Sequence, residues 1–215
     1  METILSNIYF FTLKACVLFG FLFFIRNKKY GYLHTLPFFI LFIYIIEKYG
    51  EYLINNHKQN VWLYNYSSVL EICYYIWVVS KMYVNKKYFK IAAIINVLII
   101  IISLVNIIFF QGKQGFHTIT FGLGSILVIL SCIYYYYQLF IFPSTTALYK
   151  QMEFWVVTAI MFDFTCGFLI FCLNNIYYNK ISEKIWPIII DFKDTISITF
   201  YLLFIIAFIC KIKKF

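Results

Sequence analysis

Apolar residues run through this chain in seven long stretches that are separated by short polar segments. The stretches cover residues 4–25, 35–54, 62–82, 91–110, 119–141, 154–174 and 187–210. Each has about 20 residues, the length that a helix needs to cross the hydrocarbon core of a bilayer. The connections are 7 to 12 residues long and leave no room for a folded domain between stretches. The pattern predicts an all-α bundle of seven transmembrane helices, forming a single integral membrane domain over residues 1–215.

Composition supports the membrane class and excludes two others. Of the 215 residues, 63% are hydrophobic and 13% are charged. A soluble domain of this size is not expected to be so apolar, and a disordered chain carries far more charge. The sequence therefore places the function within the bilayer or at its two faces.

Lysine and arginine residues are distributed unevenly between alternate loops, and this distribution predicts the orientation. Eleven lie after the first, third, fifth and seventh stretches, whereas four lie in the opposite loops. Because positively charged loops stay in the cytoplasm, we expect the N-terminus outside and the C-terminus in the cytoplasm. The net charge of +9 reflects this bias and attraction to anionic lipid, and direct nucleic-acid binding is not expected.

Six carboxylates lie inside the apolar stretches, and the predicted orientation puts them at similar depth, toward the outer leaflet. Together with one buried amide, the candidate pocket or ion-binding residues are Glu47, Glu51, Asn65, Glu71, Asp163, Asp191 and Asp194. A carboxylate in hydrocarbon costs roughly 3 kcal/mol on insertion scales, so an acid at such a position indicates a functional site. The sequence predicts an acidic intramembrane pocket, open toward the outer face, for a cation, a proton or a small polar ligand.

Two lysines, Lys14 and Lys193, lie within the same stretches as charge partners for these acids. By depth, Lys14 is expected to pair with Glu71 or Asp163. The acids available to Lys193 are Asp191, Asp194 and Glu51. A purely structural alternative stays open: the lysines neutralise two acids and fix helix packing, while the other acids reach interfacial water.

Five of the stretches are therefore expected to surround one polar cavity, namely 4–25, 35–54, 62–82, 154–174 and 187–210. Stretches 91–110 and 119–141 carry an Ile/Val run and a Gly/Ser stripe, respectively. Such features suit peripheral helices or helices that face a partner subunit.

The sequence predicts no cofactor, no metal site and no catalytic residues. The six cysteines are scattered without a C-x-x-C pair, and His34, His57 and His117 lie at loop level instead of in pairs inside the stretches. Seven stretches with a lysine in the last are also found in rhodopsins. Lys193, however, lies near the outer end with acids at positions −2 and +1, which departs from the rhodopsin pattern.

Three short motifs resemble a group of uncharacterised small multi-pass inner-membrane proteins of Bacteroidota. They are Leu36-Pro37-Phe38-Phe39 leading to Glu47, Asn65-Tyr66 followed by Glu71, and Glu153-Phe154-Trp155. The resemblance implies that Glu47, Asn65, Glu71 and Trp155 are family-marking positions, and it implies no activity. Similar small membrane proteins accompany RNA-targeting CRISPR systems and other defence loci in that phylum.

Two functional hypotheses follow. The first is a non-enzymatic sensor, channel-like or regulatory accessory protein that works through the acidic pocket together with a partner. One version of this hypothesis is an accessory of a CRISPR or other defence system. Its protein partner, or a second copy in a homo-oligomer, would dock on the basic cytoplasmic edge formed by 26–29, 81–90 and 211–214. The alternative is an enzyme that acts on a lipid or lipid-linked substrate, with Glu71 and Asp163 as acid and base.

Overall fold

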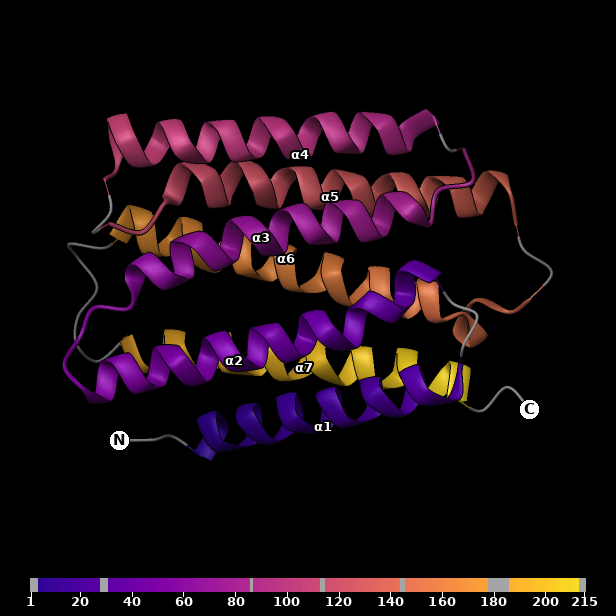
Figure 1. Cartoon of the computed structure of the whole chain (residues 1–215), viewed down its shortest axis with the longest axis horizontal. Coiled ribbons are helices and arrows are strands. Elements are labelled where there is room, and N and C mark those ends of the chain that lie inside the picture. The colour runs from indigo at the N-terminus through magenta and orange to yellow at the C-terminus, as the bar shows by residue number, and fades with distance from the viewer. Residues whose placement is uncertain are drawn as a thin grey trace. The chain divides into compact units, whose positions relative to one another are not determined.

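A computed structural model of the chain describes residues 4–27, 31–85, 87–112, 115–143, 146–177 and 186–212, without the side chains of 171–177 and 186–187. The described residues are all-α (Figure 1). The seven long helices are α1 (Ile4–Arg26), α2 (Leu36–Asn55), α3 (Val61–Lys81), α4 (Lys87–Val105), α5 (Thr118–Ile141), α6 (Met152–Tyr177) and α7 (Trp186–Ile212). Three short segments join them: η1 (Gly31–Thr35), η2 (Asn106–Phe110) and η3 (Leu148–Lys150). The seven predicted helices are thereby confirmed.

Six of these helical segments are long and apolar enough to cross a membrane, among the residues that the structure describes. The chain is therefore a multi-pass membrane protein whose helices contact lipid. The long helix α3 does not meet the combined requirement of length and hydropathy for a membrane span. It carries Asn65, Ser67 and Glu71 in its first half. Its polar side chains are largely enclosed, since Asn65 and Ser67 are both buried.

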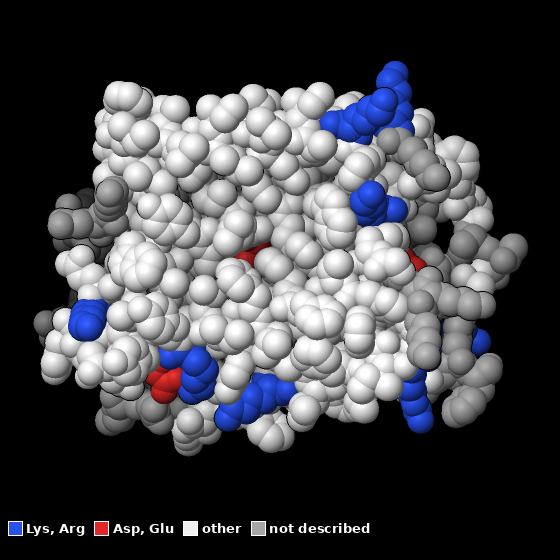
Figure 2. All heavy atoms as spheres, in the orientation of Figure 1, with Lys and Arg blue, Asp and Glu red and all other residues white. Residues whose placement is uncertain are grey.

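The surface is apolar in keeping with lipid contact. On the face shown in Figure 2, the charged side chains of the described residues occupy small areas, and most of the described surface is uncharged. Large aliphatic side chains are exposed along α4, including Ile94, Val97, Leu98 and Ile101. In water, such a surface would drive aggregation, whereas in a bilayer it faces acyl chains at no cost.

The chain divides into two compact units. Unit 1 comprises Met1–Ile40 and Ser144–Phe215, and in it α7 packs against both α1 and α6. The α1–α7 contact is aromatic: Phe23 stacks on Phe208, with ring centroids 5.6 Å apart. Gly20 lets α1 approach closely, because a Cβ there would lie 3.2 Å from Pro37 and 3.3 Å from the Phe208 ring.

Unit 2 comprises Leu41–Pro143, and in it α3 lies beside both α4 and α5 (Figure 1). Gly124 of α5 packs directly on Ile72 of α3, with no space for a Cβ. The Gly/Ser stripe of this helix allows another helix to approach closely, and at Gly124 and its buried neighbour Ser125 the stripe is enclosed by the packing of unit 2. The peripheral place of α4 and α5 around the polar cavity stays a prediction. The stripe serves close helix packing inside the chain.

Candidate functional site

The turn between α2 and α3 brings the first two candidate elements together. The chain reverses at His57, which adopts a left-handed backbone conformation (φ 56°). The Lys58 N–H donates to the Leu53 carbonyl (2.8 Å) and the His57 N–H to the Ile54 carbonyl (2.9 Å). This pair of bonds is the Schellman closure of a helix C-terminus. It returns the chain so that α3 contacts the acidic face of α2.

Tyr64 of α3 meets that face. Its hydroxyl donates a hydrogen bond to Oε2 of Glu47, across 3.2 Å. Gly50 lies one helical turn after Glu47, and a Cβ at this position would overlap the Tyr64 hydroxyl. Residues three apart share a helix face, so Glu47 and Gly50 present an acceptor and a recess to the same phenol.

Two further carboxylates act electrostatically on the same hydroxyl. The charges of Glu71 and Glu51 both act on Tyr64, in addition to that of Glu47. Lys48 forms an ion pair with Glu51, and both side chains are about one-third exposed (38% and 34%). We name the set Glu47, Lys48, Glu51, Tyr64 and Glu71 the Tyr64 cluster. Three carboxylates and one ammonium give it an excess of negative charge.

The Tyr64 cluster is not a compact metal cage. In the described parts of the chain, no three His, Cys, Asp or Glu side chains are arranged to hold a metal ion together. A cation bound at the cluster would therefore interact mainly through charge, with few direct ligands.

Asn65 is the next residue after Tyr64 but belongs to different surroundings. Its side chain is 2% exposed. Its Nδ2 donates to the Gly115 carbonyl (2.8 Å), and its Oδ1 accepts from the His117 backbone N–H (2.9 Å). Successive residues of a helix point about 100° apart, which separates Asn65 from the acids. Asn65 fixes the segment that leads into α5.

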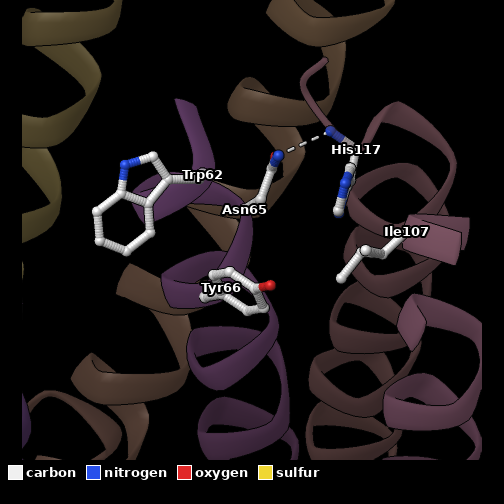
Figure 3. Close-up of a pocket in the computed structure, with 5 residues that line it drawn as sticks. All are labelled: Trp62, Asn65, Tyr66, Ile107 and His117. Atoms are coloured by element: carbon white, nitrogen blue, oxygen red, sulfur yellow. Dashed lines mark hydrogen bonds between the residues drawn. The ribbon is translucent and has the colours of Figure 1, made fainter. Parts of the chain in front are cut away.

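A pocket of about 220 Å³ lies beside this amide (Figure 3). It is lined by Trp62, Asn65, Tyr66, Ile107 and His117. Ile107 belongs to η2, a π-helical end of α4 in which the Gln111 N–H donates to the Asn106 carbonyl, five residues back (2.9 Å). Such π-turns are frequent at functional sites.

Polar side chains hold the wall of the pocket in place. Nδ2 of the buried Asn106 donates to Gln111 Oε1 (2.7 Å) and to Thr120 Oγ1 (3.1 Å). Gln111 in turn donates through Nε2 to the hydroxyl of Thr118. The network ties the end of α4 to the start of α5, so the pocket has a fixed frame.

The candidate acids of unit 1 lie on α6 and α7. Asp163 of α6 is half-buried, and the nearby positive charge that acts on it is Lys193 of α7. The sequence predicts Lys14 as the partner of Asp163, and Asp191, Asp194 or Glu51 as partners of Lys193. Lys14 is exposed and forms no ion pair among the described residues.

Asp191 and Asp194 are both half-buried in the first turns of α7. The Oδ1 atom of Asp191 is buried, with no hydrogen-bond partner in the described part of the chain. These acids and Asp163 belong to unit 1, whereas Glu47, Glu51, Asn65 and Glu71 belong to unit 2. The single cavity shared by all of them stays a prediction, as does the pairing of Lys14 with Glu71.

Lys211 differs from its expected role. The sequence counts it with the basic docking edge, but its side chain is buried and its Nζ lies 3.8 Å from Oε1 of Glu153. This ion pair joins the end of α7 to the start of α6 within unit 1. Lys211 is therefore a packing residue of unit 1.

Three residues that matter here are missed by the sequence reasoning: Gly50, Tyr64 and His117. In the sequence, Tyr64 is one of many aromatic residues expected at the membrane interface, and His117 is expected in a loop. One available sign is the placement of Gly50 one turn after Glu47, since a glycine inside a helix usually marks a close approach.

No protein-family model, curated protein sequence or solved structure matches this chain. Its class therefore rests on its own helices: it is a multi-pass helical membrane protein.

Proposed function

We propose that this protein is a non-enzymatic membrane module that binds a cationic group at the Tyr64 cluster and transmits the binding to a partner protein. In this proposal the chain has seven spans, the N-terminus is outside, and the membrane is the inner membrane of a bacterial cell. The Tyr64 cluster then lies toward the outer leaflet and senses the outer aqueous phase.

The observation that carries the proposal is that three carboxylates act on one phenol. Glu47 accepts a hydrogen bond from Tyr64, the charges of Glu51 and Glu71 act on the same hydroxyl, and the cluster holds one lysine, Lys48. In surroundings of low dielectric constant, such an excess attracts a cation strongly. The absence of a chelating geometry among the described residues favours a monovalent or organic cation.

The polar character of α3 is compatible with a seventh span. Polar groups inside a membrane are tolerated where protein groups satisfy them, and α3 meets this condition at Tyr64 and Asn65. Orientation is tested by labelling single cysteines introduced at Lys58 and Lys87, against the unaltered protein as background. We expect position 58 to react from outside and position 87 only after permeabilisation. The reverse pattern would contradict the proposed topology.

Each unit has exposed basic residues that are available for a partner. Arg26 in unit 1, and Lys81, Lys87 and Lys90 in unit 2, are exposed and suit an acidic partner surface. A regulatory accessory of a CRISPR or other defence system is one version of this role. The genes beside the coding sequence distinguish this version from a kinase-linked or transporter-linked one.

Cation binding is tested with protein in nanodiscs, titrated with tetramethylammonium, Na⁺ or K⁺ while the melting temperature is followed. A ligand at 100 times its Kd stabilises the folded state by about 2.7 kcal/mol. We expect the wild type to be stabilised and Glu47→Gln to lose most of the effect. Asp163→Asn, in the other unit, is the matched control and keeps it. A wild type that none of these cations stabilises would contradict the proposal.

The enzyme alternative makes a different prediction. It requires both Glu71 and Asp163, so Glu71→Gln and Asp163→Asn would each abolish function in cells while the purified variants stay folded. Under the binding proposal, Glu71→Gln impairs function and Asp163→Asn does not.

A further inference from the structure

The imidazole of His117 determines what the pocket beside Asn65 can recognise. The side chain is 2% exposed, and its Nε2 lies 2.8 Å from the carbonyl oxygen of Gly112. A carbonyl oxygen only accepts hydrogen bonds, so Nε2 carries the hydrogen and donates it. The other nitrogen, Nδ1, is buried and has no partner within the described residues.

In the neutral imidazole, Nδ1 of His117 is a hydrogen-bond acceptor without a donor among the described residues. A cationic ring would leave both a charge and an N–H unpaired in an enclosed site, which is costly. In the neutral ring, Nδ1 offers a lone pair. A ligand that fits must therefore bring a hydrogen-bond donor to this atom.

The rest of the lining is mainly apolar. The side chains of Tyr66 and Ile107 converge on the same space as the His117 ring (Figure 3). The volume of about 220 Å³ is below the roughly 300–1,000 Å³ of pockets that enclose a whole drug-sized ligand. The pocket therefore suits a small polar end of a molecule, with the remainder outside.

The surface next to the pocket suits an acyl chain. Ile108, Phe109 and Phe110 follow Ile107 on η2 and are 69%, 75% and 73% exposed. They continue the exposed aliphatic surface of α4, which faces lipid in a membrane protein. A molecule whose head enters the pocket would thus lay its tail on an apolar surface.

We propose that the pocket formed by α3, η2 and the segment before α5 binds the head of a neutral membrane lipid with a free hydroxyl, such as a diacylglycerol. The hydroxyl donates to His117 Nδ1, the glycerol portion contacts Tyr66 and Ile107, and the acyl chains lie along Ile108–Phe110. Heads that carry a phosphate or carboxylate are disfavoured, because they bring negative charge to an acceptor atom in an apolar pocket. The site is separate from the Tyr64 cluster and does not depend on cation binding there.

The test measures binding of dioleoylglycerol to the full chain in detergent by native mass spectrometry. Its methyl ether, which lacks the donor, is the matched ligand. Losing one hydrogen bond to a buried acceptor costs about tenfold in affinity, which corresponds to about 1.4 kcal/mol. We expect dioleoylglycerol to bind and its ether to bind about tenfold more weakly.

Two protein variants test whether dioleoylglycerol binds in this pocket. Ile107→Trp fills the pocket and is expected to reduce binding of dioleoylglycerol by about tenfold or more. Ile133→Trp adds the same bulk at a position of α5 that is 48% exposed and lies outside the pocket lining, and it is expected to leave binding unchanged. Melting temperatures confirm that both variants are folded.

Three results would overturn the proposal. They are equal binding of dioleoylglycerol and its ether, equal effects of the two tryptophan variants, and stronger binding of dioleoyl phosphatidic acid than of dioleoylglycerol. None of them bears on the cation titration, which uses residues of the Tyr64 cluster.

Discussion

The hydroxyl of Tyr64 on α3 donates a hydrogen bond to Oε2 of Glu47 on α2, across 3.2 Å, at a point where Gly50 leaves no Cβ in the way. The two helices thus meet through a polar contact that a single methyl group would disturb. Because Glu51 and Glu71 also act on this phenol, the contact involves all three carboxylates of unit 2.

Gly50→Ala should displace Tyr64 from Glu47. The added Cβ overlaps the phenol hydroxyl, and overpacking of this kind costs about 1–3 kcal/mol. The measurement is the free energy of unfolding in mixed micelles, together with cation binding. Gly167→Ala is the control, because nothing lies within 4 Å of a Cβ at that position. It should be neutral or stabilising by up to about 1 kcal/mol, since alanine favours the helix. Equal effects of the two substitutions would contradict the close contact at Gly50.

Gly124→Ala should destabilise the packing of α5 on α3, because a Cβ there overlaps the side chain of Ile72. We expect a loss of about 1–3 kcal/mol in the free energy of unfolding. Ile72→Val removes the Cδ1 atom that lies nearest, so the double variant should recover part of the loss. A double-mutant cycle measures this coupling, and strictly additive effects would argue against direct contact.

Lys211→Met should leave Glu153 without its partner in unit 1. Breaking a buried ion pair on one side costs roughly 3 kcal/mol or more, and the partial exposure of Glu153 makes the lower end the better estimate. The double variant Lys211→Met/Glu153→Gln should be more stable than the single variant, because it removes the uncompensated charge. Lys87→Met, at an exposed position, should change stability by less than about 0.5 kcal/mol.

The buried phenol of Tyr83 should make the stability of the folded state depend on pH in alkaline solution. Its hydroxyl donates to the Ser131 carbonyl (3.0 Å), and burial raises the pKa of the phenol from 10.0 to about 12. The folded state therefore holds this proton more tightly than the unfolded state. Its contribution to stability is complete below pH 10 and is lost as the pH rises toward 12.

Tyr83→Phe should accordingly lose about 1 kcal/mol at neutral pH, the worth of one hydrogen bond. Between pH 10 and 12 its free energy of unfolding should fall less steeply than that of the wild type. Exposed Tyr137→Phe serves as the control and should keep the wild-type slope. A Tyr83→Phe slope equal to the wild-type slope would contradict the role of burial.

The helices themselves could be predicted well, because seven runs of about 20 apolar residues leave the backbone few alternatives in a bilayer. The prediction is weakest at α3, where Asn65, Ser67 and Glu71 lower the hydropathy. The structure accounts for part of this polarity, since Asn65 is buried and hydrogen-bonded to the segment before α5, and Ser67 is buried. At the α5 stripe, Gly124 indicates close helix contact in the sequence, and the structure identifies the contact as Ile72 of α3.

The sequence by itself determined that this is a multi-pass helical membrane protein, and it selected the acids worth attention, because hydrophobic length and the cost of buried charge are local properties of a segment. Only the tertiary structure decided which groups meet. Tyr64 bonds to Glu47 and experiences the charges of Glu51 and Glu71, Asn65 bonds to the His117 backbone, and the charge of Lys193 acts on Asp163. The physical reason is rotational: consecutive residues of a helix point about 100° apart, so contacts depend on how each helix is turned and packed, which composition and spacing do not encode.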